Sequence, residues 1–165
     1  MATINSCNTQ LIVQAASGSV TYPLQPAFLA TGGAQANVTG DGTVYTVLFA
    51  TEVVDRQGVY SSPTFTAPVT GKWMISATIY LQQLAAAHTG CSANITTTSS
   101  TYAPIAVSAA IRDANNNWQS CVVSALANMT ASDTATVTVT VSGSTKVIDI
   151  GTTNLLTNFS ARLVG

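Results

Sequence analysis

The sequence predicts an all-β domain, folded as a two-sheet sandwich or jelly roll. Its clearest strand spans residues 134–141, where alanine or valine alternates with threonine at every second position. Residues 71–81 alternate in the same way and place Trp73 on one face and Met74 on the other. Turn sequences rich in glycine, serine and aspartate separate such segments, and no segment keeps a helical period for long.

Further strands are expected wherever β-branched or aromatic residues recur with this period. These segments are residues 26–30, 44–49, 105–112, 119–126 and 159–164. Residues 71–81 have no strongly polar face. We therefore expect the core on one side of this strand and a subunit interface or a second layer on the other. Residues 81–88, which include three consecutive alanines, are the only helix-like stretch.

The low charge of the chain narrows its possible partners. Charged residues form 7% of the sequence, whereas an ordinary domain contains about 25%. Such a chain is expected to hide much of its surface against neighbouring subunits. The net charge of -1 includes no basic block, which argues against nucleic-acid binding. No apolar run approaches the roughly 20 residues of a membrane helix and no signal peptide is recognised, so we expect no membrane partner.

The three cysteines, Cys7, Cys91 and Cys121, follow no zinc-binding spacing. An odd number leaves at least one of them unpaired. The favoured interpretation is that they are buried free thiols of a protein made in a reducing cytoplasm. The alternative is a single Cys91–Cys121 bridge.

Titratable residues are few and scattered, so the sequence predicts no enzyme, no catalytic residue, no cofactor and no metal site. His88 is the only histidine and is interpreted as a structural or surface residue. The alternative is that three copies of His88 meet on a three-fold axis and bind a metal ion. Asp41, between two glycines, is interpreted as a turn former, and a weak calcium site at Asp113 or Asp133 stays open.

Trp118 follows three asparagines and has two interpretations. On an exposed polar loop, its ring would stack on a sugar or anchor a partner. In the favoured interpretation it begins the next strand and covers the edge of the core, because large aromatic side chains are buried more often than not.

Four motifs carry a resemblance to a known family. They are Gln-Pro-Ala-Phe-Leu-Ala at 25–30, Val-Thr-Gly-Asp-Gly-Thr at 38–43, Phe-Thr-Ala-Pro-Val-Thr-Gly-Lys at 65–72 and Asn-Phe-Ser-Ala-Arg-Leu at 158–163. The sequence resembles the globular head of complement C1q, in the tumour-necrosis-factor-like jelly-roll superfamily, and most of all the version in bacteriophage and cyanophage virion proteins. Ala161 departs from the family, which usually has glycine there.

This resemblance covers residues 25–165 and implies a jelly-roll domain that forms a homotrimer. Residues 1–24 are left as an N-terminal arm. Six residues on small or weakly polar strand faces are candidates for the trimer interface: Met74, Thr78, Tyr80, Ala106, Ser108 and Ala110.

The function that we expect is structural, in a virion. The chain would be a trimeric decoration (cement) protein on the outer face of a phage capsid, made in the cytoplasm of the bacterial host. Its partners would be its own copies and the major capsid protein. Four apolar residues of the arm are the candidate capsid contacts: Ile4, Leu11, Ile12 and Val13. The alternative is the receptor-binding tip of a tail fibre, which would bind a host-surface glycan, and a secreted binding module is disfavoured.

Overall fold

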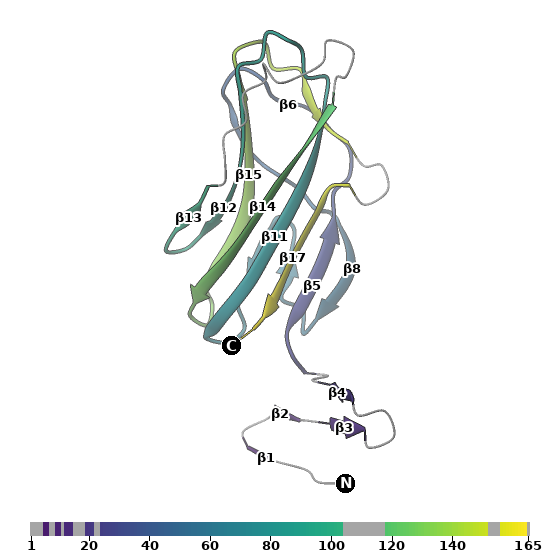
Figure 1. The fold of residues 1–165 in the computed structure, drawn as a ribbon, viewed down its shortest axis with the longest axis vertical. Helices are drawn as coiled ribbons and strands as arrows, with labels where there is room; N and C mark the ends of the chain where they lie inside the picture. Colours follow the sequence, from purple (N-terminus) through teal and green to yellow (C-terminus); the bar gives the residue numbers. More distant parts are fainter. Residues whose placement is uncertain are drawn as a thin grey trace.

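Two antiparallel sheets face each other and form the body of the protein (Figure 1). The computed structural model describes residues 24–103, 118–151 and 156–164 in full. Of the preceding residues it describes the backbone of four short strands: β1 (Asn5–Ser6), β2 (Thr9–Gln10), β3 (Ile12–Gln14) and β4 (Ser19–Thr21). These four pair with one another, β1 with β2 and β3 with β4, and not with the two large sheets.

The sheet nearer the viewer in Figure 1 is called the front sheet and has seven strands. Its strands are β14 (Trp118–Met129), β11 (Gly71–Gln82), β17 (Asn158–Leu163), β5 (Ala27–Thr31), β8 (Thr51–Arg56), β16 (Ile148–Ile150) and β6 (Gln35–Thr39). β11 is central, because it pairs with β14 on one side and with β17 and β16 on the other. Among the described residues β14 pairs only with β11, so it forms an edge of this sheet.

The second sheet, called the back sheet, has six strands. Its strands are β13 (Thr101–Tyr102), β12 (Gly90–Thr97), β15 (Thr134–Ser142), β10 (Thr64–Thr66), β9 (Tyr60–Ser61) and β7 (Val44–Thr46). β15 is its centre and pairs with β12 along most of its length. The all-β sandwich expected from the sequence is confirmed.

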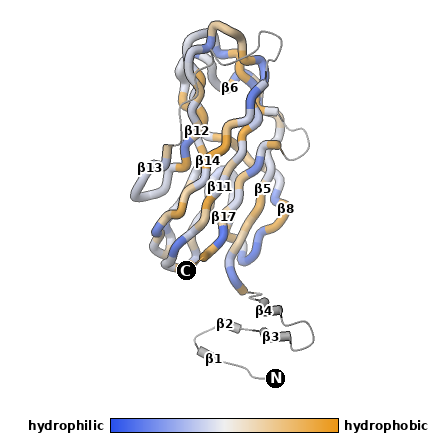
Figure 2. The backbone as a smooth tube through the Cα atoms, viewed as in Figure 1, coloured by the Kyte–Doolittle hydropathy of each residue, from blue (hydrophilic) through white to orange (hydrophobic). Residues whose placement is uncertain are grey.

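The core lies between the two sheets, because every second side chain of a strand points to the same face and is buried there. Along β11, buried residues alternate with more exposed ones from Trp73 to Leu81, and β15 does the same from Ala135 to Val141. Figure 2 shows this alternation as a change of colour along the strands of the front sheet. Aromatic rings fill the core near the start of β5: Phe28 stacks on Tyr60 with ring centroids 4.7 Å apart.

Tight turns join the strands where the sequence predicts them. Gly40 has a φ of +133°, and a Cβ placed there would lie 2.1 Å from the carbonyl oxygen of Thr145. Only glycine therefore fits this turn. Asp41 accepts a hydrogen bond of 3.0 Å from the backbone N–H of Thr43, which confirms its interpretation as a turn former.

Several sequence-based expectations need correction. Residues 81–88 contain no helix: β11 continues to Gln82, and a turn follows in which the N–H of His88 donates to the carbonyl of Ala85. β7 ends at Thr46, short of the expected strand at 44–49. β12 was not expected at all. The expected strand at 105–112 lies outside the described residues. Within the described part of the chain, no helix has the length and apolar character needed to cross a membrane.

Candidate functional site

The candidate site is the surface of the front sheet that points away from the core, here called the outer face. Directly paired residues on neighbouring strands share a face, so the register shows which side chains lie side by side. One row crosses five strands from β14 to β8: Leu126, Met74, Arg162, Ala27 and Arg56. The next row along the strands is Ser124, Ser76, Ser160, Leu29 and Val54.

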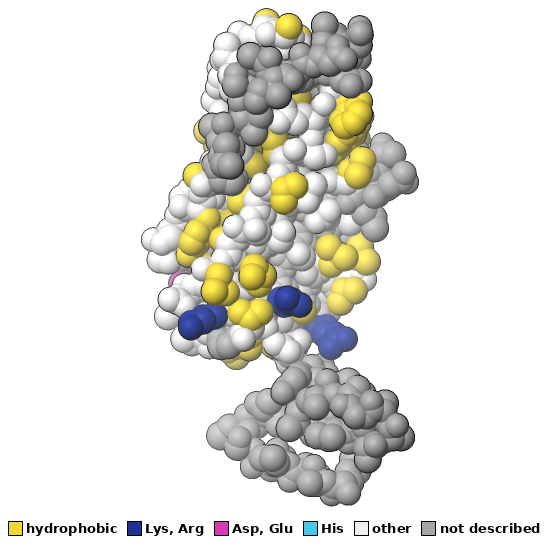
Figure 3. Space-filling view, in the orientation of Figure 1, with side chains coloured by type: hydrophobic (Ala, Val, Ile, Leu, Met, Phe, Trp, Pro, Cys, Tyr) yellow, Lys and Arg dark blue, Asp and Glu magenta, His cyan; other side chains and the backbone are white. Residues whose placement is uncertain are grey.

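Large apolar side chains are unusually exposed on this outer face. Val122 is 62% exposed and Leu126 is 54% exposed, both on β14. Met74 lies beside Leu126 on β11 and is also exposed. Figure 3 shows apolar side chains spread over this surface among small polar ones. Because apolar surface in water is costly, such a patch indicates a site for a protein partner.

The predicted trimer-interface residues fall in two groups. Met74, Thr78 and Tyr80 lie together on the outer face along β11, at the positions between the buried ones. The other three, Ala106, Ser108 and Ala110, lie outside the described residues. Val122 and Leu126 were missed by the sequence analysis. The available signal was that residues 122 and 123 are both valine, which gives β14 an apolar side chain on each face.

Lys and Arg side chains gather at one end of the outer face (Figure 3). Arg56 and Arg162 both pair with Ala27, one from each neighbouring strand, and so flank it on the same face. Lys72 precedes Met74 by two residues and shares that face. The structure gives none of these three cations an ion pair or hydrogen bond with a described residue. They form a cationic group that is suited to an anionic partner.

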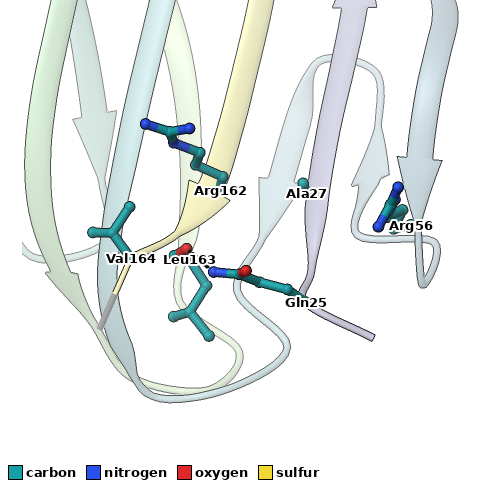
Figure 4. Close-up of a pocket in the computed structure, with 6 residues that line it drawn as sticks. All are labelled: Gln25, Ala27, Arg56, Arg162, Leu163 and Val164. Carbon is teal, nitrogen blue, oxygen red and sulfur yellow. Dashed lines mark hydrogen bonds between the residues drawn. The ribbon is translucent and has the colours of Figure 1, made fainter. Parts of the chain in front are cut away.

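Arg56 and Arg162 also line a shallow depression of about 370 Å³ (Figure 4). Its remaining lining residues are Gln25, Ala27, Leu163 and Val164. The amide of Gln25 donates a hydrogen bond to the carbonyl of Leu163, which ties the start of β5 to the end of β17. Gln25 is the first residue of the predicted domain, so Arg56 and Arg162 lie beside its start.

Trp118 lies at the opposite end of the outer face. It is the first residue of β14, as the favoured interpretation expected. It is 54% exposed, however, so the expectation that it covers the edge of the core is wrong. Its ring lies 5.9 Å from that of Tyr80, at an interplanar angle of 46°. The two rings offer an aromatic surface at this end.

His88 is a structural residue of the turn after β11. It is 1% exposed, and its Nδ1 accepts a hydrogen bond of 2.9 Å from the N–H of Ala85. A side chain this deep in one subunit cannot meet its copies on a three-fold axis, so the alternative metal site is wrong. The described residues include no group of three His, Cys, Asp or Glu side chains that could hold a metal ion.

The carboxylates that the structure describes serve mainly to fix turns. Asp133 accepts hydrogen bonds from the backbone N–H of Thr130 at 2.8 Å and from its hydroxyl at 2.9 Å, and these bonds lower the pKa of Asp133. Hydrogen bonds from the side chain and backbone of Thr43 lower the pKa of Asp41 in the same way. Asp149 accepts from the N–H of Asn37 at 2.7 Å. Asp113, the other candidate for a weak calcium site, lies outside the described residues.

The predicted capsid-contact residues are described only in part. Ile12 and Val13 lie in β3, which pairs with β4. Ile4 and Leu11 lie outside the described residues. The division into an arm and a jelly-roll domain stays a prediction.

The fold and the outer face together define a class: an all-β, two-sheet jelly roll with an exposed, partly apolar sheet surface. Neither the protein-family models nor the curated proteins include a match. Among solved structures, murine APRIL at pH 8.5 matches with a TM-score of 0.56 and 10% identity, over 85% of this chain and 99% of that one. The globular domain of the zebrafish complement 1qA protein matches with a TM-score of 0.56 and 14% identity, over 85% and 98%. These likenesses establish the C1q and tumour-necrosis-factor type of jelly roll.

Proposed function

We propose that this chain is a non-enzymatic structural protein that forms a homotrimer through the outer face and decorates the outer surface of a phage capsid. The observation that carries self-association is the exposure of Val122, Leu126 and Met74 on one continuous sheet surface. A flat surface with small neighbours such as Ser76 and Ser124 permits close packing of a second subunit. Association would remove these apolar side chains from water.

The proposed capsid role has separate support. The motifs at 38–43 and 65–72 resemble those of phage virion proteins. Two residues of the cationic group, Arg56 and Arg162, lie beside Gln25, where the proposed domain begins. The arm and the cationic surface would then bind the same neighbouring protein. A trimer would carry three copies of this pair, and binding of one copy would hold the other two at a high effective concentration, which raises the overall avidity. Capsid protein with an acidic outer surface fits this arrangement.

Two measurements on the whole protein test this function. Sedimentation equilibrium should give the mass of a trimer at micromolar concentration, and a monomer would contradict self-association. Quantitative mass spectrometry of purified particles should find copies of this chain comparable in number to the major capsid protein. Only a handful of copies per particle would instead place it on a tail appendage.

Deletion of residues 1–17 separates the arm from the domain. The truncated protein should remain trimeric, because the outer face is intact, yet bind undecorated capsids much more weakly. Raised salt should weaken capsid binding by the full-length protein as well, since it screens exposed Arg and Lys. Unchanged capsid affinity after the deletion would show that the arm is not the anchor.

A receptor-binding tip that adheres to glycans is the second candidate function. It is favoured by the exposed Trp118 ring next to Tyr80, since aromatic rings can stack on sugar faces. Replacement of Trp118 with alanine should then abolish binding on a glycan array while the trimer persists. Array binding that is absent from the start, or unaffected by this change, would remove the second candidate.

A further inference from the structure

Cys91 and Cys121 come together between the two sheets. Cys91 is in β12 of the back sheet and Cys121 is in β14 of the front sheet, and both side chains occupy inward positions. They are 2% and 8% exposed, and their sulfur atoms lie 2.9 Å apart. The two strands are far apart along the chain, so only the packing of the sandwich brings these thiols into contact.

The surroundings of the two thiols are apolar. Cys91 pairs across its sheet with Val141, and Cys121 pairs with Ile79. Among the described residues each sulfur has only the other as a hydrogen-bond partner. No described histidine or carboxylate joins them in a metal-binding group. The pair is therefore placed for chemistry between its own two sulfur atoms.

The contact also makes the two thiols unequal. A hydrogen bond between them favours a single shared thiolate and opposes a second one. It raises the pKa of Cys91, with burial adding to the effect, and it lowers the pKa of Cys121. Cys121 is also the more exposed of the two. Since the thiolate is the nucleophile in disulfide exchange, Cys121 is the thiol expected to react first.

We propose that Cys91 and Cys121 are a redox pair that closes into a disulfide between the two sheets, with a low-molecular-weight disulfide such as oxidised glutathione as the oxidant. The Cys121 thiolate attacks oxidised glutathione, forms a mixed disulfide and releases one glutathione thiolate, which takes a proton. Cys91 then gives up its proton and attacks the Sγ atom of Cys121, which releases the second glutathione. Two protein thiols and one oxidised glutathione become one protein disulfide and two reduced glutathione molecules.

This bond would link β14 of the front sheet covalently to β12 of the back sheet. It would stabilise the fold chiefly by restricting the unfolded chain, since it closes a long loop. It would form after the protein leaves a reducing compartment, because glutathione and related systems keep thiols reduced there. The protein would then be more stable outside the cell than where it is made.

Thiol counting on the wild-type protein tests the proposal. One sample is refolded in a glutathione redox buffer and a second is incubated natively with oxidised glutathione. Both are then denatured and labelled with a maleimide mass tag. A third sample, kept reduced with dithiothreitol, should be labelled at all three cysteines. After oxidation neither Cys91 nor Cys121 should be labelled, and Cys7 should either be labelled or carry a mixed disulfide with glutathione. Peptide mapping should recover the segments containing Cys91 and Cys121 as one bridged species.

Cys7→Ser provides the matched control, because it removes the third thiol without touching the pair. This variant should carry two labels when reduced and none when oxidised. Oxidation should also raise its melting temperature by roughly 5–15 °C. In the Cys7→Ser background, Cys121→Ser should keep one label and show no redox-dependent shift. Three labels in the oxidised wild-type protein by both routes, or a bridge that involves Cys7, would overturn the proposal.

Discussion

The outward surfaces of the two sheets follow the same strand periodicity and differ in chemistry. On the back sheet, the outward positions of β15 carry Thr136, Thr138 and Thr140, and those of β12 carry Ser92, Asn94 and Thr96. On the front sheet, β14 and β11 carry Trp118, Val122, Leu126, Met74 and Tyr80 at the equivalent positions. Val44 is the one exposed large apolar side chain in the described strands of the back sheet.

The difference shows which side chains cover the surface of a chain with only 7% charged residues. Uncharged polar side chains line the outward surface of the back sheet, and most of them are partly exposed, although the Oδ1 atom of Asn94 is buried. The front sheet lacks even this solvation over much of β14 and needs a partner to cover it. This difference is the one expected if the outer face is the association surface that we propose.

The largest effect on the free energy of unfolding is expected when an inward and an outward side chain of β11 are compared. Trp73→Ala removes a fully buried ring and should lower the free energy of unfolding by about 3–5 kcal/mol. Met74→Ala, at the next residue, should change the stability of the monomer by less than about 1 kcal/mol, because its side chain faces outward. Urea denaturation of dilute protein measures both values. Equal losses would show that the outer face is already part of a core within one subunit.

An intermediate effect is expected from two threonines that differ in burial. The Thr39 hydroxyl is buried, donates to the carbonyl of Thr43 at 2.7 Å and accepts from the N–H of Val141 at 2.9 Å. Thr39→Val leaves those groups without a partner and should cost about 1–3 kcal/mol of stability. Thr138→Val, on the outward side of β15, should change stability by less than about 0.5 kcal/mol. A larger loss at Thr138 would contradict the view that its hydroxyl contributes little to the stability of the fold.

The smallest effect on stability concerns a carboxylate that fixes a turn, Asp133. The pKa of Asp133 is lowered from 3.8 by its bonds to Thr130, so its ionised form stabilises the folded state. This stability is present above the unfolded pKa and is lost as pH falls through the lowered folded pKa. Melting curves should therefore show a smaller acid-induced loss for Asp133→Asn than for the wild type. Identical acid profiles would show that this turn contributes nothing to pH dependence.

Sequence periodicity was sufficient for the strands that bury large side chains. β11 and β15 were expected almost to their observed ends, because tryptophan, isoleucine and valine mark their inner faces. β12 was missed because its inward residues begin with Cys91 and Ala93, which are too small to give a clear pattern. Local signals are weak wherever packing is made by small residues.

The candidate sites depend on pairing between distant segments, which no local pattern reports. Arg56 and Arg162 meet only because β8 and β17 both pair with β5. Cys91 and Cys121 were considered as a pair from the sequence, but their contact depends on how the sheets stack. Trp118 was expected to be covered, and it is exposed because it occupies an outward position of β14.

The most direct test of the central claim, that the outer face is the self-association surface, uses two matched valines. Val122 on the front sheet is 62% exposed and Val44 on the back sheet is 65% exposed. Val122→Glu and Val44→Glu place the same charge at equally accessible positions on opposite sides of the sandwich. Sedimentation equilibrium should find Val122→Glu as a folded monomer and Val44→Glu as a trimer like the wild type. A Val122→Glu protein that remains trimeric, or a Val44→Glu protein that alone dissociates, would contradict the account.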